Sequence, residues 1–356
     1  MKINFILPSF GNNPIGGFKV VYEYANRLVA SGNIVNVIHP LLLQKHDSLY
    51  RQTRSYGRYL ISKFDKSYRP DSWFTLDSRV NVLMVPFLSE KYIPNADFLI
   101  ATAWYTTKPL AYLSNRKGKK YYIIQNYEIW AGEKNEILSS FRLPFKKIVI
   151  SHWLEKLVNS QGEDAFYIPN GFDFKAFGID VRPEDRNNST IMMLYHKLHF
   201  KCSNFGLRAI KKVKDVIPNL KLILFSVYPP PEKLPEWISF YHQTEQSTLR
   251  SLYNESAIFI SPSILEGFAL PPAEAMLSGC ALIASDIGGH REYAISNSTA
   301  LLFPPKDIRK LIDNICLLID NNTFRIKLAY DGHNFIKQFS WEKSSNNLET
   351  ILKNDL

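Results

Sequence analysis

The chain has 356 residues, and its 43 lysines and arginines against 33 aspartates and glutamates give a formal net charge of +10. That length predicts two domains rather than one, and 46% hydrophobic residues supply enough apolar material for two cores. The positive balance favours an anionic partner, whether nucleic acid, nucleotide or membrane surface. The sequence has no zinc-finger spacing, RNA-binding aromatic signature or long basic tail, which disfavours nucleic acid.

The cysteines Cys202, Cys280 and Cys316 lie far apart and form no C-x-x-C pair. This pattern predicts reduced thiols in a cytoplasmic protein, and no zinc site. Residues 1–7 form too short an apolar run for a signal peptide, and no stretch approaches the apolar length that spans a bilayer. We therefore expect a cytoplasmic protein.

The first segment reads as a strand over residues 2–7, a loop over 8–17, a helix over 18–30 and a strand over 33–38. This order predicts a Rossmann-like opening. Gly16 and Gly17 lie where the loop meets the helix, and such small residues let backbone N–H groups approach a diphosphate. An ordinary turn is the alternative. The pattern is not G-x-G-x-x-G, so it does not indicate NAD.

Further strands are predicted over residues 80–85, 98–101, 121–125 and 147–151, and helices over 104–113 and 152–159. Ligands of open parallel sheets lie at the carboxyl ends of the strands. Thr102, Trp104, Tyr105 and residues 125–128 fall at such ends. Exposed aromatic rings there would suit a sugar acceptor, although core packing is the commoner use of Trp and Tyr.

Residues 45–69 form a basic, aromatic segment. Tyr56, Leu60, Phe64 and Tyr68 recur every four residues, among seven cations and two anions: Lys45, Arg51, Arg54, Arg58, Lys63, Lys66 and Arg69 against Asp47 and Asp65. The spacing is typical of an amphipathic segment that docks onto an anionic membrane. The alternative is a surface helix that packs its apolar stripe on its own domain.

A polar linker is predicted over residues 182–190, and a second Rossmann-like unit follows it. Its strand 190–195, helix 203–213, strand 220–225 and helix 249–256 lead to a strand over 257–260, and helices are expected over 306–318, 323–338 and 341–352. Lys197 and Lys201 lie between the first strand and helix of this unit. Each lysine could equally be a solvated surface charge.

The most informative stretch covers residues 261–290. A turn with Glu266 and Gly267 leads to Pro271, Pro272 and a helical pattern over residues 273–277. Proline is tolerated in a first helical turn, so the loop ends at a helix N-terminus, where free N–H groups and the dipole favour anions. Gly267 lets the backbone approach a ligand closely. With Glu274 in the first turn, two carboxylates can accept hydroxyl hydrogen bonds, which suits a sugar nucleotide. A capped helix is the alternative.

The residues from Glu266 to Glu274, EGFALPPAE, resemble the E-x7-E signature of the family 4 retaining glycosyltransferases. Residues 279–289, GCALIASDIGG, with Glu292 resemble that family's next strand and loop. Residues 150–154 and 167–173 are similar to its hinge-side sequence. The resemblance is strongest over residues 149–341.

The resemblance implies an α/β protein of the GT-B fold, in which two Rossmann-like domains face each other across a cleft and the C-terminal helix crosses back to the N-terminal domain. We expect an acceptor-side domain over residues 1–180 with 341–356, and a nucleotide-sugar-binding domain over 181–340.

The resemblance also implies site roles. Glu274 would bind ribose hydroxyls and Glu266 sugar hydroxyls. Lys201, with Lys197 as a looser match, would stabilise charge on the leaving diphosphate. Backbone groups would hold the phosphates or the sugar at Gly16, Gly17, Gly267, Phe268, Ala269 and Leu270.

The implied function is transfer of a hexose or deoxyhexose from a nucleotide-diphosphate sugar to a glycan or lipid-linked acceptor, in cell-surface polysaccharide or O-antigen assembly, with retention. The sequence has no D-x-D motif, so we expect no metal, and the donor is a substrate rather than a cofactor. We expect the enzyme at the inner face of the cytoplasmic membrane. The alternatives are a non-catalytic nucleotide-sugar-binding protein and an epimerase on the same fold, which would need an N-terminal acidic and histidine cluster that the sequence lacks.

Overall fold

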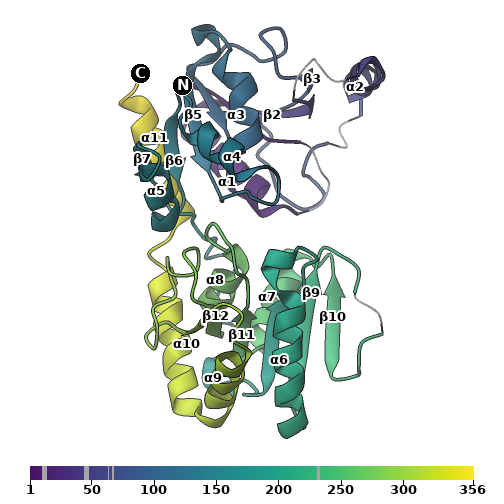
Figure 1. Cartoon of the computed structure of the whole chain (residues 1–356), viewed down its shortest axis with the longest axis vertical. Coiled ribbons are helices and arrows are strands. Elements are labelled where there is room, and N and C mark those ends of the chain that lie inside the picture. The colour runs from purple at the N-terminus through teal and green to yellow at the C-terminus, as the bar shows by residue number, and fades with distance from the viewer. Residues whose placement is uncertain (10–13, 44–47, 63, 66–67, 231–232) are drawn as a thin grey trace. The chain divides into compact units, whose positions relative to one another are not determined.

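The computed structural model of the chain describes residues 1–9, 14–43, 48–62, 64–65, 68–230 and 233–356. The chain divides into two compact units (Figure 1). Unit 1 comprises Met1–Asn170 and Trp341–Leu356, and unit 2 comprises Gly171–Ser340. The boundary therefore falls after Asn170, before the position expected from the sequence.

Within the described residues, unit 1 holds a seven-stranded sheet in the order β3-β2-β1-β4-β5-β6-β7, with every neighbouring pair parallel. Both faces of a parallel sheet are covered, so its strands tend to be near-continuous apolar runs, such as β4 (Phe98–Ala101), in which every residue is buried. The strands are β1 (Lys2–Ile6), β2 (Ile34–Leu42), β3 (Asn81–Phe87), β4 (Phe98–Ala101), β5 (Lys119–Ile124), β6 (Lys146–Val149) and β7 (Ala165–Tyr167).

The helices of unit 1 are α1 (Gly16–Ala30), α2 (Leu49–Ser62), α3 (Trp104–Ala111), α4 (Lys134–Phe141), α5 (His152–Asn159) and α11 (Trp341–Lys353). The last helix, yellow in Figure 1, packs on α1, where the Trp341 and Tyr24 ring centroids are 5.6 Å apart. Asp355 accepts hydrogen bonds from Tyr121 at 2.8 Å and Lys146 at 2.7 Å. The predicted return of the C-terminal helix to the N-terminal domain is confirmed.

Unit 2 holds a parallel sheet of six strands within the part of the chain that is described, in the order β10-β9-β8-β11-β12-β13. Its strands are β8 (Thr190–Leu194), β9 (Lys221–Ser226), β10 (Ile238–His242), β11 (Ile258–Ser261), β12 (Ala281–Ser285) and β13 (Ala300–Phe303). The edge strand β10 was not predicted. It is only partly buried, so its sequence lacks the apolar run that marks β8 and β11.

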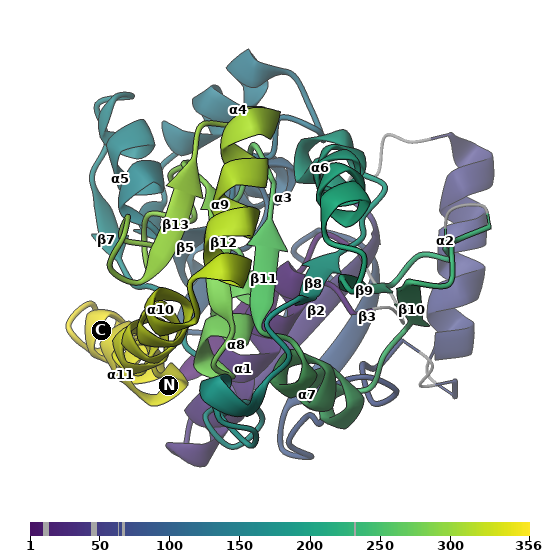
Figure 2. The same cartoon turned by 90° about the horizontal axis from the view of Figure 1, so that it is seen from below.

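The helices of unit 2 are α6 (Ser203–Val216), α7 (Gln246–Glu255), α8 (Leu270–Leu277), α9 (Ile308–Asp320) and α10 (Asn322–Ile336). Figure 2 shows α6 and α9 on one face of the sheet and α7 and α8 on the other. From β8 the chain continues to β9 and β10 on one side of the sheet, whereas from β11 it continues to β12 and β13 on the other side. The strand order therefore reverses between the neighbours β8 and β11. In open α/β sheets, such a switch point is where ligands bind.

The predicted linker over residues 182–190 is wrong, because this segment is part of unit 2. Arg186 is buried and donates to the carbonyl oxygens of Val181, Tyr253 and Ser256 at 2.7, 3.2 and 3.0 Å. A buried guanidinium needs such partners. The polar composition that suggested a linker therefore reflects internal hydrogen bonding.

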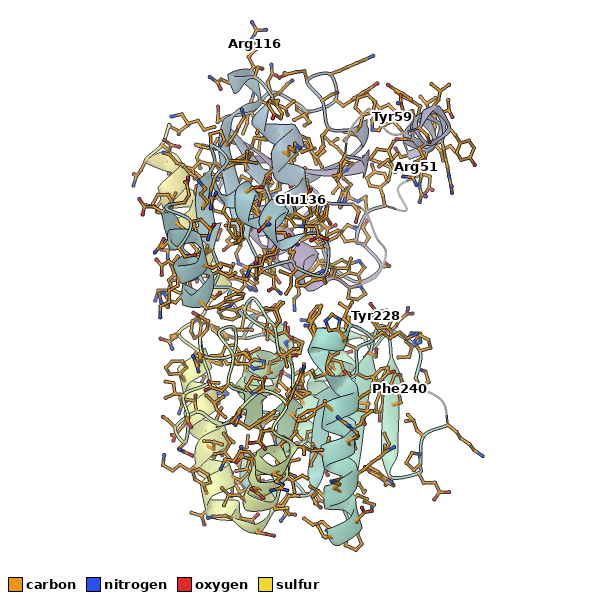
Figure 3. All side chains as sticks on the ribbon, in the orientation of Figure 1. Arg51, Tyr59, Arg116, Glu136, Tyr228 and Phe240 are labelled. Carbon is orange, nitrogen blue, oxygen red and sulfur yellow. The ribbon has the colours of Figure 1, made fainter. Side chains whose placement is uncertain are left out.

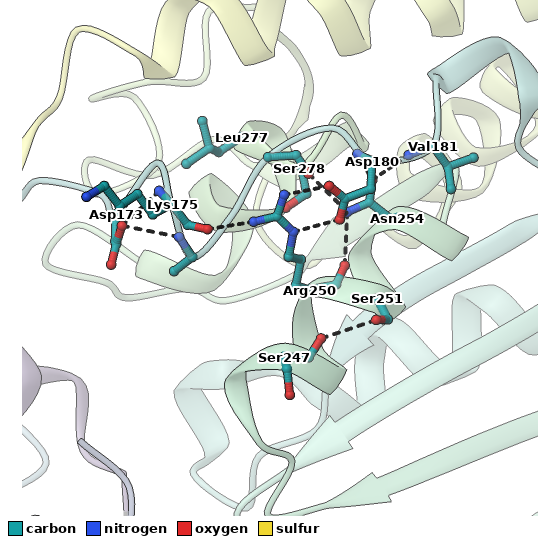
Figure 4. A network of polar contacts seen from close by, with 12 residues as sticks. Asp173, Lys175, Asp180, Val181, Ser247, Arg250, Ser251, Asn254, Leu277 and Ser278 are labelled. Carbon is teal, nitrogen blue, oxygen red and sulfur yellow. Dashed lines mark hydrogen bonds and ion pairs between the residues drawn. The ribbon is translucent and has the colours of Figure 1, made fainter. Parts of the chain in front are cut away.

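The segment before it is tied to α7 as well (Figure 4). Arg250 donates to Asp180 at 2.6 Å and to the Lys175 carbonyl at 2.6 Å. The Asn254 side chain accepts from the backbone N–H of Asp180 at 2.7 Å. These bonds explain why the boundary between the units precedes residue 180.

Candidate functional site

Helix α8 begins at Leu270, earlier than predicted, and its first positions include Pro271 and Pro272. Glu274 therefore lies beyond the first turn rather than within it. The residue before the helix, Ala269, has φ 61°, a left-handed conformation that costs a non-glycine residue about 1–3 kcal/mol. The Tyr293 hydroxyl donates to the Ala269 carbonyl at 2.8 Å and holds this bend in place.

Lys201 and Glu266 form an ion pair at the carboxyl ends of β8 and β11. The Lys201 Nζ lies 2.7 and 2.8 Å from the two carboxylate oxygens of Glu266, which is only 7% exposed. The two strands are neighbours at the point where the strand order reverses. The structure thus brings together two of the predicted site residues, and both oxygens of the carboxylate face a cation.

Lys197 lies elsewhere. Its Nζ is 5.6 Å from the ring centroid of Tyr228, just beyond β9, and the His196 ring meets the same tyrosine edge-on at 4.9 Å (Tyr228 is labelled in Figure 3). Burial, with a smaller effect from Lys201, lowers the pKa of His196 to about 4. The two lysines predicted as a pair are thus separated, and only Lys201 contacts Glu266.

Glu274 is 6% exposed, and its Oε2 lies 3.4 Å from the hydroxyl of the buried Tyr253 on α7. Phe268 is a core side chain, with ring centroids 5.5 Å from Tyr293 and 5.7 Å from Phe339. Its predicted role concerned only its backbone N–H. The packing of Phe268 anchors the residues between Glu266 and α8, so this loop is fixed from inside the unit.

In unit 1, Gly16 and Gly17 form the first turn of α1 rather than a loop. The Gly17 carbonyl accepts from the Gln125 side chain at 3.1 Å, and a Cβ at Gly17 would lie 3.4 Å from that side chain. The glycine pair therefore begins a helix beside the carboxyl end of β5. Residues 10–13 of the predicted loop lie outside the described residues.

Unit 1 also contains a cavity of about 650 Å³, which we call the aromatic cavity. Its walls come from the end of β2, from α3 and from α4, whose Glu136 is labelled in Figure 3. They include Leu41, Leu42, Leu43, Trp104, Tyr105, Lys108, Tyr112, Glu136 and Leu143. From the sequence, Trp104 and Tyr105 are candidates for an acceptor site. The leucines at the end of β2 and helix α4 could not be identified in this way, because they are distant from Trp104 in the sequence.

Glu128 holds the start of α3, which forms part of the wall of the aromatic cavity. Its carboxylate accepts from the backbone N–H of Trp104 at 3.0 Å, at the start of α3. Burial raises the pKa of Glu128 to about 7. Gly132 packs so closely that a Cβ there would lie 2.1 Å from the Trp104 ring. The position of Trp104 is thus set by the loop that follows β5.

Helix α2 has two different faces. The inner face packs on β3 and its surroundings, with Ser55 donating to the Pro86 carbonyl at 2.7 Å and Tyr59 lying 5.6 Å from Tyr92 (Tyr59 and Arg51 are labelled in Figure 3). The outer side of the helix exposes large apolar residues, and so does the turn after it: Leu49 79%, Tyr50 73%, Leu60 57% and Ile61 61% on the helix, and Phe64 92% beyond it.

The predicted apolar stripe is therefore divided. Tyr56 packs on Phe87 with centroids 5.8 Å apart, whereas Leu60 and Phe64 are exposed. Lys45, Lys63 and Lys66 of the predicted basic set lie outside the described residues. Across the residues that are described, no helix is long and apolar enough to span a membrane.

Comparisons with known proteins include a family match that lies within unit 2. Residues 232–335 match the family described as "Glycosyl transferases group 1". Phosphatidyl-myo-inositol mannosyltransferase of Mycobacterium tuberculosis is 24% identical over 195 residues, 51% of each chain. The chain spans about half or less of the length of the curated relatives it matches.

Two solved structures superimpose on nearly the whole chain. Sucrose-phosphate synthase from Thermosynechococcus elongatus has a TM-score of 0.75 at 15% identity, covering 99% of this chain and 98% of that one. HepE from Anabaena in complex with UDP-glucose has a TM-score of 0.73 at 15% identity, covering 99% and 100%. Identities this low show the fold alone. The chain therefore has the predicted GT-B type of fold, and residues 232–335, which include Glu266 and Glu274, match the glycosyl transferases group 1 family.

Proposed function

We propose that this protein is a glycosyltransferase that moves a hexose or deoxyhexose from a nucleotide-diphosphate sugar to a glycan or lipid-linked acceptor in cell-surface polysaccharide assembly. The observation that carries the proposal is the Lys201–Glu266 pair beside the start of α8, at the switch point of the unit 2 sheet. The match of residues 232–335 to glycosyl transferases group 1 supports it.

On the donor side, the leaving diphosphate accumulates negative charge during transfer. Lys201 is the cation at the switch point, and backbone N–H groups of Phe268, Ala269 and Leu270 precede or begin α8, where the helix dipole favours anions. Fixed donors of this kind are often the largest catalytic contribution. They would stabilise the leaving group without a metal ion, with Glu266 binding sugar hydroxyls and Glu274 the ribose. HepE, whose fold this chain shares, is described with UDP-glucose.

On the acceptor side, we assign the aromatic cavity to the acceptor glycan. Its volume of about 650 Å³ lies within the range of about 300–1,000 Å³ typical of ligand sites. Aromatic faces such as those of Trp104 and Tyr105 pack against the C–H faces of sugars, and Lys108 and Glu136 offer polar groups at the walls. The carboxyl ends of β2 and β4 border it, as expected for a ligand site of an open sheet.

Helix α2 provides the membrane contact in this proposal. Its outer side combines exposed apolar residues such as Leu60 and Ile61 with the exposed cations Arg51 and Arg54. Basic residues near an anionic leaflet contribute about 1 kcal/mol each, and apolar side chains add insertion into the headgroup region. The name of one relative, phosphatidyl-myo-inositol mannosyltransferase, includes a lipid. We therefore place the enzyme at the inner face of the cytoplasmic membrane, bound reversibly through unit 1.

A donor screen tests the function. UDP-, GDP- and dTDP-sugars are compared by thermal shift, and each hit is tested for transfer and hydrolysis. A donor present at 100 times its Kd should stabilise the folded protein by about 2.7 kcal/mol. Binding without any transfer or hydrolysis would favour the non-catalytic alternative, and interconversion of the free nucleotide sugars would favour the epimerase. No binding by any donor would refute the proposal.

A further inference from the structure

His290 is buried in unit 2, with 0% exposure, and its ring contacts the start of residues 261–267, which we call the Glu266 loop. We propose that His290 is a positioning residue, which holds the Glu266 loop in place through hydrogen bonds to Ser261 and Ser285. It would thereby fix the geometry of the Lys201–Glu266 pair. Its effect on catalysis rests on the proposed function, but its effect on the loop does not.

The hydrogen bonds of His290 define its tautomer. Nδ1 lies 2.8 Å from the backbone carbonyl of Ser285, which can only accept, so Nδ1 carries the proton. Nε2 lies 2.9 Å from the Ser261 hydroxyl and is left as an acceptor. Ser261 therefore donates to the ring. The neutral ring joins the last residue of β11 to the last residue of β12, two neighbouring strands.

The same segment touches the Glu266 loop twice more. The Ser285 hydroxyl donates to the Ser263 carbonyl. Gly289 passes so close that a Cβ there would lie 2.4 Å from the Glu266 carbonyl oxygen. Residues 285–290 thus support the loop at its beginning, near its middle and at Glu266 itself. Because the ring of His290 is fully buried, it acts on a ligand only through this loop.

Protonation of the ring would disturb this support. Imidazolium is a donor at both nitrogens, so Nε2 could no longer accept from Ser261. The charged groups that act on the ring are Glu266 and Asp286, which favour its charged form, and Lys201, which disfavours it. Burial outweighs them and holds the pKa of His290 below its ordinary value of 6.5. The ring is therefore neutral at neutral pH, and support should be lost only in acid.

Two variants test the proposal without removing a residue of the donor site. His290→Phe keeps a ring but removes both hydrogen bonds, and Ser261→Ala removes one hydroxyl. Amide hydrogen exchange of residues 261–267, measured without donor, should become faster in both variants. The His290 ring itself should show the Nδ1–H tautomer by NMR in the wild type.

With the best donor from the screen, kcat should fall by about 10- to 100-fold in His290→Phe, since small misplacement of a site costs about this much. Donor KM should change less. The double variant His290→Phe with Ser261→Ala should have the same kcat as His290→Phe, because the two changes remove the same hydrogen bond. His333→Phe is the matched control. His333 is half-buried and its Nδ1 bonds the Leu277 carbonyl at the other end of α8, so kcat should be unchanged.

The outcomes separate cleanly. Unchanged exchange of residues 261–267 in both variants would overturn the proposal, and so would a lower melting temperature with unaltered loop exchange and kcat. Faster loop exchange together with reduced kcat supports it. If the wild type transfers no sugar, the proposed function fails, while the exchange measurement still decides whether His290 holds the loop.

Discussion

The candidate site of unit 2 and the outer side of α2 in unit 1 are built in opposite ways. In unit 2 the polar groups are already bonded to one another, as Lys201 is to Glu266 and His290 to Ser261. On α2 large apolar side chains project outward, with Leu49 79% exposed. Internal bonding fixes a site for a small ligand of defined shape, whereas exposed apolar and basic side chains suit a fluid surface. Substitutions in the two regions should therefore fail differently.

The largest effect is expected at Lys201, which would test whether the internal pairing matters. Under the proposed function, Lys201→Met should lower kcat by about 10²- to 10³-fold, because it would remove a fixed cation from beside the leaving group. It also leaves a buried carboxylate unpaired, which costs about 3–5 kcal/mol of folding stability. Turnover with a saturating donor and thermal melts give the two values.

Two controls separate these effects of Lys201. The double variant Lys201→Met with Glu266→Gln should recover the melting temperature but not kcat, since it removes both charges. Lys197→Ala should change kcat much less, because Lys197 lies over Tyr228 instead. Equal losses from Lys197→Ala and Lys201→Met would contradict the distinction between the two lysines.

The pH dependence of stability should reveal Glu128 in unit 1. Its pKa is about 7 in the folded protein, against an ordinary value of 4.5, so the folded state binds more protons between these values. Stability from this group is therefore greatest below pH 4.5 and falls as pH rises to 7, by at most about 3 kcal/mol. Glu128→Gln keeps an acceptor for Trp104 and should flatten this part of the curve. Parallel curves for variant and wild type would refute the assignment.

Glu274 should affect donor affinity more than fold. Under the proposed function, Glu274→Gln would keep the shape of the side chain but weaken hydrogen bonds to ribose, each worth about 1.5–3 kcal/mol when the acceptor is charged. Donor Kd by calorimetry should rise about 10- to 100-fold, the same energy expressed as affinity. Tyr253→Phe removes the internal hydroxyl and should leave donor affinity near wild type. Unchanged Kd in Glu274→Gln would show that Glu274 is only a buried structural carboxylate.

The smallest effect per residue is expected on α2. Arg51→Glu and Arg54→Glu should each weaken binding to anionic liposomes by about 1 kcal/mol or more at low salt, with donor binding intact. Sedimentation at low and high salt measures this, and Leu60→Ser with Ile61→Ser tests the apolar part. Neutral liposomes are the control. If the wild type ignores anionic liposomes at low salt, α2 is an ordinary surface helix.

The sequence alone was enough for most of the alternation of strands and helices, for a two-unit chain and for the residues around Glu266, but it did not predict α4, β7, β10 or β13. Apolar runs such as that of β11 report burial on both faces, and Pro271 with Pro272 marks a helix start within one turn. These signals are local, so they survive without knowledge of the partner strands. The edge strand β10 was missed because it is only partly buried and therefore lacks such a local apolar run.

Only the tertiary structure decided which of these residues meet. Lys201 contacts Glu266 because β8 and β11 are neighbours in the sheet, although the two residues are far apart in the chain. The same holds for His290 with Ser261 and for Arg186 with the carbonyl groups around it. Which apolar residues of α2 turn inward depends on where β3 lies. Periodicity along one element identifies a buried face, but pairing between elements is set by strand order and register, which no local pattern encodes.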